Sequence, residues 1–466
     1  MIRQAAVGSG VHHRVFGQGQ VVESRYRGFK LQVQFADGVV RWVRRHEVDI
    51  GTPTAAKPQP ERAVGPPPPS LKFRRMVEAF KLGIVPDEAV REFTFGRDEE
   101  VRSIGEWLAA PARSVLLLLG EYGSGKTHLL EYVRWHALDA GYACSMVELD
   151  PNEAPLHRPK RVYAGLVRGF RYRDATGKVR RFRDFIRDLA GRTTSLNDHP
   201  FLALPIQAAR SGTESEDLWT WIEGQESWRS PTLFDHSTSA NLYCNILSGL
   251  SRGATPLGLK GLLLLFDEAE SLDVGATNYQ IERGMNFLRG LVLVCKSAPE
   301  LREDVEDYVR TSFSWDGLRS NLVGHFGALS GLQYSGHRTS TPFIWRSPSH
   351  LKALFAFAPT HRIGTTFLSG AEQLEIESLS QDVLKEIFQR MCTIYQEAHG
   401  YLPSDSVRQR VYKLLKDGLG TPETSRAESC LRKRAGGGWL GFIQSSRRSM
   451  VWRLGHLNSP CVKGCK

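Results

Sequence analysis

The sequence has 466 residues and a net charge of +11, and a chain of this length is expected to form two or three domains. Its longest apolar runs, VLLLLG from Val115 and GLLLLF from Gly261, are far shorter than the roughly 20 residues of a membrane helix, which argues against a membrane protein. Seven widely spaced cysteines argue against a disulfide framework, and the first residues lack the apolar core of a secretion signal, so a cytoplasmic location is expected.

The N-terminal segment alternates apolar and polar residues, as in Leu31, Val33 and Phe35, which is typical of half-buried β-strands. An Asp-Gly pair directly afterwards indicates a hairpin turn. The phrase VHHRVFGQGQVV resembles the small SH3/Tudor-like barrel at the ends of some bacterial DNA helicases and polymerase-binding factors. We therefore expect a β-barrel over residues 1–51, and both partner docking and DNA contact are open as its role.

Residues 52–70 are rich in proline and poor in apolar side chains, which predicts an extended linker. Apolar positions at helical spacing follow, then a Gly-Ile-Val-Pro break, a second short helix and the phrase FGRDEE. We expect a second domain, built on an α/β core, over residues 71–372.

A glycine-rich loop then joins a predicted strand to a predicted helix. Residues 120–127 read GEYGSGKT and satisfy G-x-x-x-x-G-K-[ST]. Glycines adopt backbone angles closed to other residues, so successive N–H groups can curl around phosphate oxygens at the positive end of the helix dipole. Lys126 is expected to reach the β- and γ-phosphates during catalysis, and Thr127 to ligate Mg²⁺. The predicted ATP-binding residues are Gly120, Glu121, Tyr122, Gly123, Ser124, Gly125, Lys126, Thr127 and His128.

The phrase GLLLLFDEAESL predicts a buried strand that ends in two acids, Asp267 and Glu268. Ligands of parallel α/β sheets sit at the carboxyl ends of the strands, so both acids are expected near the phosphates. We expect Asp267 to hold Mg²⁺ through a water molecule. Glu268 is positioned to act as the general base on the attacking water, and the acid pair therefore predicts hydrolysis rather than binding alone.

About 140 residues separate these motifs, which predicts a second strand in GYACSMVELD and a basic helical insertion at about 155–255. Residues 158–192 carry 12 Lys/Arg against 3 Asp/Glu, interleaved with aromatic side chains, a mixture that suits nucleic acid. A shared ATPase interface and a solvated arginine face over a buried core are the alternatives. Helical spacing favours core positions for Val162, Leu166, Val167, Phe170, Phe182, Phe185, Ile186 and Leu189.

The phrase HLKALFAFAPT predicts another buried strand. Together with the glycine-rich loop and the acidic strand, it leads us to expect that residues 71–372 form a three-layer, AAA+-like core of the P-loop NTPase type. In AAA+ proteins, which this arrangement resembles, the strand beside the acidic one ends in a residue that senses the γ-phosphate, and Thr360 is the candidate here. From Leu374 onward the pattern predicts a long amphipathic helix and an all-helical lid over residues 373–424. In such a lid an arginine would reach back to the nucleotide, and Arg426 is the nearest match to that arginine. An arginine that reaches into the nucleotide site of a neighbouring subunit could be any of Arg283, Arg289 and Arg319.

Residues 425–466 show no sustained period and are rich in Ser, Arg, Gly, Trp and Cys. From Arg426 onward they carry 9 Lys/Arg against 1 Asp/Glu. We interpret them as an irregular basic tail, and a frame-shifted C-terminus is one hypothesis for it. Under that hypothesis, the charge of this tail says nothing about DNA binding.

The chain resembles the BREX-type ATP-binding proteins, the BrxD-like, AAA+-like ATPases of bacterial and archaeal anti-phage islands. The resemblance spans roughly residues 72–420 and rests on FRRMVEAFKLGIVPDEAVREFTFGRDEE, GEYGSGKTHLLEYV, VELDPNEAPLHRPKRVYAGLVRGF, LLLLFDEAESL and LEIESLSQDVLKEIFQRMCTIYQEAHGY. It implies ATP with Mg²⁺, a homo-oligomer, and DNA or a helicase-like defence protein as the partner. The family tends to carry a Pro-Arg pair at the start of the last lid helix, whereas Glu423 stands at that arginine's place here, which leaves the second sensor unassigned.

Two functions follow as hypotheses. The first is an ATPase that couples its nucleotide state to DNA binding, remodelling or translocation in anti-phage defence. The alternative is a nucleotide-gated scaffold or regulator that recruits a helicase or nuclease and turns over little ATP. A free-standing helicase is disfavoured because only one P-loop core is found in the sequence.

Overall fold

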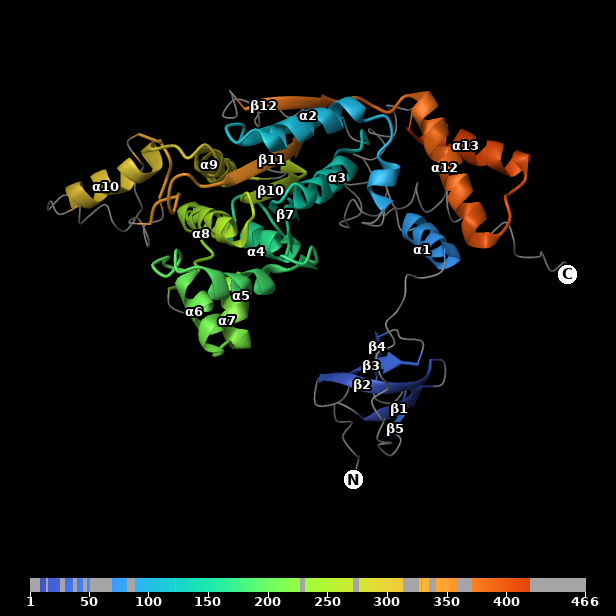
Figure 1. Ribbon diagram of the computed structural model, residues 1–466, viewed down its shortest axis with the longest axis horizontal. Helices are drawn as coiled ribbons and strands as arrows, with labels where there is room; N and C mark the ends of the chain where they lie inside the picture. The colour runs from blue at the N-terminus through green and yellow to red at the C-terminus, as the bar shows by residue number, and fades with distance from the viewer. Residues whose placement is uncertain are drawn as a thin grey trace. The chain divides into compact units, whose positions relative to one another are not determined.

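The computed structural model describes residues 9–13, 16–25, 30–36, 40–44, 48–50, 69–81, 89–121, 123–226, 231–270, 276–312, 327, 329–334, 341–358 and 371–419. The chain divides into two compact units, Met1–Pro67 and Pro68–Lys466, whose elements are labelled in Figure 1. Within these described ranges, no helix is long and apolar enough to cross a membrane.

The first unit contains one antiparallel sheet of five strands in the order β4-β3-β2-β1-β5. The predicted alternation is confirmed, since Leu31, Val33 and Phe35 are all buried. The described strand pairs form an open ladder from β4 to β5, so the closed SH3/Tudor-like barrel stays a prediction. The strands are β1 (Gly10–His13), β2 (Gly17–Arg25), β3 (Lys30–Phe35), β4 (Val40–Arg44) and β5 (Val48–Ile50).

The second unit is built on a five-stranded sheet in the order β12-β6-β11-β10-β7, in which every neighbouring pair is parallel. The strand that precedes the glycine-rich loop, β6, therefore lies inside the sheet, and β11 separates it from the acidic strand β10. The carboxyl ends of all five strands meet at one edge. The strands are β6 (Val115–Gly120), β7 (Ala143–Glu148), β10 (Leu262–Asp267), β11 (Leu351–Phe357) and β12 (Glu372–Ile376).

Helices cover both faces of this sheet, which is why β6, β10 and β11 are largely apolar without alternation and are buried along their whole length. Leu116 and Leu118 pack with α2 (Asp98–Ala109) and α3 (Lys126–Asp139). Leu117 and Leu119 belong to the larger core on the opposite face, with α4 (Pro159–Gly169), α8 (Ala240–Ala254) and α9 (Asn278–Cys295) (Figure 1). The unit is thus an α/β fold with a parallel sheet between two helical layers.

The predicted insertion is helical and is part of the core. Its apolar residues at helical spacing are all buried, which confirms the prediction that they face the core. The short strands β8 (Tyr172–Arg173) and β9 (Val179–Arg180) form a hairpin within it. Its helices are α4 (Pro159–Gly169), α5 (Phe182–Arg192), α6 (Ala203–Ser211), α7 (Glu216–Ile222) and α8 (Ala240–Ala254), and α9 (Asn278–Cys295) and α10 (Glu300–Ser312) follow after β10.

The prediction that a helix begins at Leu374 is wrong. Leu374 lies in β12, which pairs with β6 as the fifth strand of the sheet, and the helix α12 (Gln381–His399) begins only after the Ser380 cap. The short period-2 pattern of an edge strand was hidden by the strong helical period directly after it. The core sheet therefore extends beyond the predicted boundary at residue 372.

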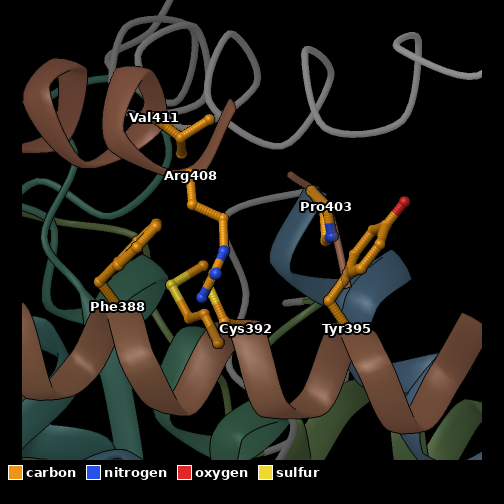
Figure 2. A pocket seen from close by; sticks show the side chains of 7 residues that line it. Phe388, Cys392, Tyr395, Pro403, Arg408 and Val411 are labelled. Atoms are coloured by element: carbon orange, nitrogen blue, oxygen red, sulfur yellow. The ribbon is translucent and has the colours of Figure 1, made fainter. Parts of the chain in front are cut away.

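A helical cluster follows the sheet. The helix α12 packs against α1 (Pro69–Lys81) through Met76 and Ile394, and α13 (Asp405–Leu419) follows. Between α12 and α13 lies a small apolar pocket, shown in Figure 2 and lined by Phe388, Met391, Cys392, Tyr395, Pro403, Arg408 and Val411. None of its lining residues comes from the glycine-rich loop or the acidic strand. Predicted residues beyond 419 lie outside the described part of the chain.

Candidate functional site

The glycine-rich loop turns sharply between β6 and α3. Gly123 and Gly125 have φ values of 83° and 95°, in the left-handed region that strains other residues. Gly125 caps α3, which begins at Lys126 as predicted, and the Ser124 amide donates to the Glu121 carbonyl at 3.1 Å. The loop therefore has the tight turn that phosphate binding requires, while Tyr122 lies outside the described residues.

Gly120 has a different role from the one predicted, because its φ is not positive. A Cβ at this position would lie 2.6 Å from the Ser124 Oγ and 3.1 Å from the Ile376 carbonyl oxygen. Glycine is required here because the loop and β12 approach the backbone closely. The Ser124 hydroxyl beside it is buried and has no hydrogen-bond partner within the described structure.

Lys126 is buried, with 8% of its surface exposed, and its ammonium group folds back onto the loop. Its Nζ donates to the Gly120 carbonyl at 2.6 Å and to the Glu121 carbonyl at 3.2 Å. Burial lowers the pKa of Lys126, and the field of nearby carboxylates, led by Glu270 and Asp267, acts in the opposite direction. The lysine therefore sits among backbone oxygens and in the field of several acids.

Asp267 ends β10 and is 4% exposed. Burial raises its pKa, while a hydrogen bond from the Thr127 side chain favours the charged carboxylate. The fold therefore brings the side chains of the two predicted Mg²⁺ ligands within hydrogen-bonding reach of each other. A hydroxyl and a carboxylate are oxygen ligands of the kind that Mg²⁺ prefers, so this pair fits the ion that was predicted.

Glu268, the predicted general base, follows Asp267 with a φ of 52°, which is unusual for a residue other than glycine. Its amide donates to the Asp267 Oδ1 at 3.0 Å, and its side chain is half-buried. The backbone thus turns at the sheet edge immediately after the aspartate. Strained backbone of this kind is held by its surroundings and clusters at functional sites.

Glu270 is a site residue that the sequence reasoning missed. Its side chain is 5% exposed, and neither carboxylate oxygen makes a hydrogen bond of ordinary geometry within the described structure. Burial raises its pKa, whereas the backbone amides of Glu270 and Ala358 and the charge of Lys126 favour its ionised form. The signal was present as the third acid of the DEAE phrase, after the two acids that were interpreted.

The remaining predicted residues lie in several places. The His128 Nε2 is 3.1 Å from the Thr94 hydroxyl, at the segment before α2. β11 ends at Phe357 beside β10, as the sensor prediction requires, but Thr360 itself lies outside the described residues.

Two of the arginines that were candidates for a finger have partners within the chain. Arg283 stacks over the Tyr279 ring at 4.6 Å, and Arg289 donates to the Ser330 carbonyl at 3.3 Å. Arg319, Glu423 and Arg426 also fall outside the described ranges.

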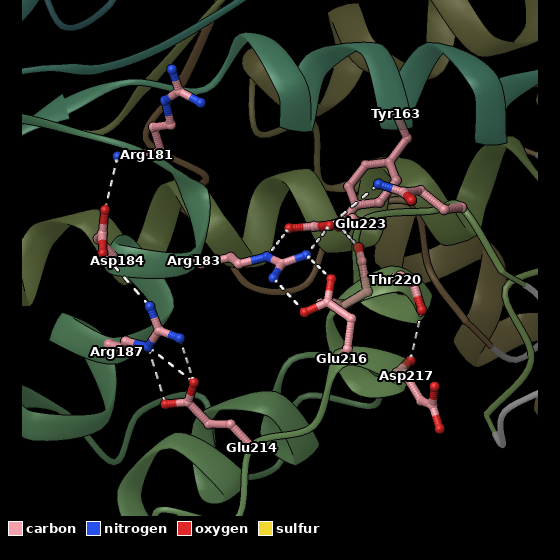
Figure 3. Close-up of polar contacts among 12 residues, drawn as sticks. Tyr163, Arg181, Arg183, Asp184, Arg187, Glu214, Glu216, Asp217, Thr220 and Glu223 are labelled. Carbon is pink, nitrogen blue, oxygen red and sulfur yellow. Dashed lines mark hydrogen bonds and ion pairs between the residues drawn. The ribbon is translucent and has the colours of Figure 1, made fainter. Parts of the chain in front are cut away.

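Arg183 and Arg187 of α5 are paired with acids from residues 214–223 (Figure 3). The Arg183 guanidinium forms ion pairs with Glu223 at 2.6 Å and with Glu216 at 2.7 Å, and these partners raise its pKa. Arg187 pairs with Glu214 at 2.6 Å. The acids lie beyond residues 158–192, so the local excess of positive charge in the sequence is reduced by the fold. The aromatic side chains of the stretch are buried, which removes them as stacking surfaces for bases.

Residues 70–178 match the family described as BREX system ATP-binding protein BrxC/D. Over this part, which includes the glycine-rich loop, the chain is similar to ATP-binding proteins of a phage-defence system. No curated protein matches the sequence. One solved structure with similarity is the HORMA:CdnC:Trip13 complex of E. coli MS115-1, at 10% identity and a TM-score of 0.24, over 82% of this chain and 86% of that chain. A TM-score this low supports no further comparison.

Proposed function

We propose that the protein is a Mg²⁺-dependent ATPase of BREX-type phage defence. The observation that supports this best is the contact between Thr127, at the start of α3, and Asp267, at the end of β10. It places an oxygen pair suited to Mg²⁺ beside a loop with an ammonium group and the start of a helix, which together suit a triphosphate. The similarity of residues 70–178 to an ATP-binding family agrees with this choice of ligand.

In the proposed mechanism the loop amides and Lys126 orient the β- and γ-phosphates. Bound Mg²⁺ would neutralise charge on the phosphate oxygens. Thr127 and Asp267 hold their oxygens toward the ion's position, while Glu268 accepts a proton from the attacking water. Glu270 remains buried behind Lys126 and limits, by its charge, how strongly the phosphates are held. We also propose Thr360 as the γ-phosphate sensor.

The proposed working target is DNA, in a homo-oligomer acting with another defence protein such as a helicase. The N-terminal sheet and the C-terminal basic residues are the candidate contact regions, because Arg183 and Arg187 of α5 are engaged in ion pairs. DNA binding through phosphates would make the affinity fall steeply with salt.

The second candidate is a nucleotide-gated scaffold or regulator. It is favoured by the ion pairs of Arg183 and Arg187 in the basic insertion, because these arginines are already bound to acids of the same chain. Under it, ATP binds and turns over slowly, DNA has no effect on the rate, and the protein recruits a helicase or nuclease through residues 1–51.

ATP hydrolysis with Mg²⁺, measured with and without DNA and alongside the mass of the ATP-bound assembly, separates the two candidates. An ATPase coupled to DNA hydrolyses ATP and is stimulated by DNA, whereas a regulator binds ATP with little turnover in either condition. Absence of ATP binding, measured by equilibrium titration, would refute both.

A further inference from the structure

Arg97 lies in the phrase FGRDEE, directly before α2, and the residue is 7% exposed. Its Nη2 donates to the Ser124 carbonyl at 2.5 Å and to the Glu377 carbonyl at 2.8 Å, and its Nη1 donates to Glu100 Oε1 at 2.7 Å. A buried guanidinium is stable only when its donors are used, and here they bind Glu100 in the first turn of α2 and two segments farther away in sequence, at Ser124 and Glu377. Arg97 therefore ties the glycine-rich loop to the chain that leaves β12.

Neighbouring residues make contacts at the same junction. A Cβ on Gly96 would lie 2.6 Å from the Val383 Cγ2, so this glycine sits directly against the first turn of α12. Thr94 contacts His128 in the first turn of α3. The segment from Thr94 to Arg97 thus touches the helix that follows the loop and the helix that follows β12.

The bond to Ser124 has a consequence for the loop. In a planar trans peptide the carbonyl of one residue and the N–H of the next point in opposite directions. By holding the Ser124 carbonyl, Arg97 fixes the direction of the Gly125 N–H on the other side of that peptide. The Gly125 N–H belongs to the loop whose amides would bind phosphate, so Arg97 acts on the ligand through the backbone.

We propose that Arg97 is a positioning residue that couples nucleotide binding in the loop to the start of α12. One guanidinium orients the Gly125 N–H and holds the Glu377 carbonyl shortly before α12 begins at Gln381. A phosphate that locks the loop therefore also restrains the first turn of α12. The coupling rests on the proposed function, since it operates only if the loop binds a nucleotide.

Arg97→Lys tests the proposal because it keeps the charge but lacks the planar guanidinium in which Nη2 bonds both carbonyls while Nη1 bonds Glu100. The readouts are equilibrium binding of the fluorescent nucleotide MANT-ATP and hydrogen exchange at residues 381–384 with and without that nucleotide. In the wild type, we expect MANT-ATP to slow this exchange. In Arg97→Lys, binding weakens by about tenfold, the size of one charge-assisted hydrogen bond, and the nucleotide no longer slows exchange in α12. Arg102→Lys, an exposed position on α2, is the matched control and behaves as the wild type.

The outcomes separate the two proposals. If the wild type does not bind MANT-ATP, the proposed function fails. If the wild type binds and Arg97→Lys shows the same affinity and the same protection of α12, the coupling is refuted while the proposed function stands. Should Arg97→Lys not fold, Glu100→Gln, which weakens the Nη1 ion pair, decides the question: a smaller loss of both readouts supports the coupling, and unchanged readouts overturn it.

Discussion

The Thr127 side chain lies within hydrogen-bonding reach of the Asp267 carboxylate, so the start of α3 and the end of β10 meet at this pair. Because we assign this pair to Mg²⁺, chelating the metal with EDTA should weaken ATP binding in the wild type. Thr127→Val removes one assigned Mg²⁺ ligand and the hydroxyl beside Asp267. The ATP affinity of this variant should therefore be nearly the same in the presence and in the absence of Mg²⁺. Isothermal titration in both conditions measures this. Mg²⁺ dependence that survives in Thr127→Val would contradict the assignment.

Glu268→Gln should bind ATP as the wild type does but lower kcat by about 10²–10⁴-fold, the usual contribution of a positioned general base. The amide keeps the shape of the side chain and removes only its ability to accept the proton. Steady-state hydrolysis and a binding titration on the same preparation measure the two effects. Glu282→Gln, an exposed position on α9, serves as the control, and an unchanged kcat in Glu268→Gln would defeat the assigned base.

Glu270→Gln should tighten ATP binding and should not lower the thermal stability of the nucleotide-free protein. The carboxylate is buried without an ordinary hydrogen bond, which costs folding free energy, and its charge repels phosphate. Removing the charge is expected to improve ATP affinity by about fivefold, or about 1 kcal/mol. Calorimetric titration and thermal melting measure both quantities. Weaker binding would show that Glu270 contributes favourably to the nucleotide complex.

Arg183→Ala should destabilise the insertion by about 1–2 kcal/mol, because Glu216 and Glu223 lose their shared partner. Its effect on the salt dependence of DNA affinity should be small, since the guanidinium is already occupied. Urea unfolding and DNA titrations at several salt concentrations measure the two effects, with the exposed Arg192→Ala as the control. A lower salt slope at unchanged stability would instead place DNA on α5.

His199 should make the fold less stable as the pH falls. Burial lowers the pKa of this histidine to about 3, from an ordinary value of 6.5. The folded ring stays neutral, accepting hydrogen bonds from the Phe201 and Leu202 amides, while the unfolded ring gains a proton below pH 6.5. The contribution of this residue to the free energy of unfolding is thus complete above pH 6.5. By pH 5 the free energy of unfolding is expected to be lower by about 2 kcal/mol. Urea unfolding at both pH values should show this loss in the wild type and not in His199→Leu.

Much of the core could be predicted from local patterns. The apolar runs of β6, β10 and β11 and the start of α3 follow from composition and glycine spacing over a few residues. The pairing of β12 with β6 could not, because its short alternating pattern precedes a strong helical period and its partner lies far away in sequence. The positive charge of α5 suggested a nucleic-acid contact for a related reason. The acids that pair with its arginines, Glu214, Glu216 and Glu223, approach them only in the folded insertion. Arg97 and Glu270 act through contacts with the loop that no spacing rule encodes.

The position of β6 between β11 and β12 also bears on synthesis. A ribosome completes the loop and Lys126 early, but both strands that flank β6 come from residues made much later, at Leu351–Phe357 and Glu372–Ile376. Long-range pairings of this kind form slowly and expose apolar strands until they close. The nascent chain is therefore expected to need chaperone protection for its leucine-rich strands, and to gain affinity for nucleotide only after β12 has left the exit tunnel.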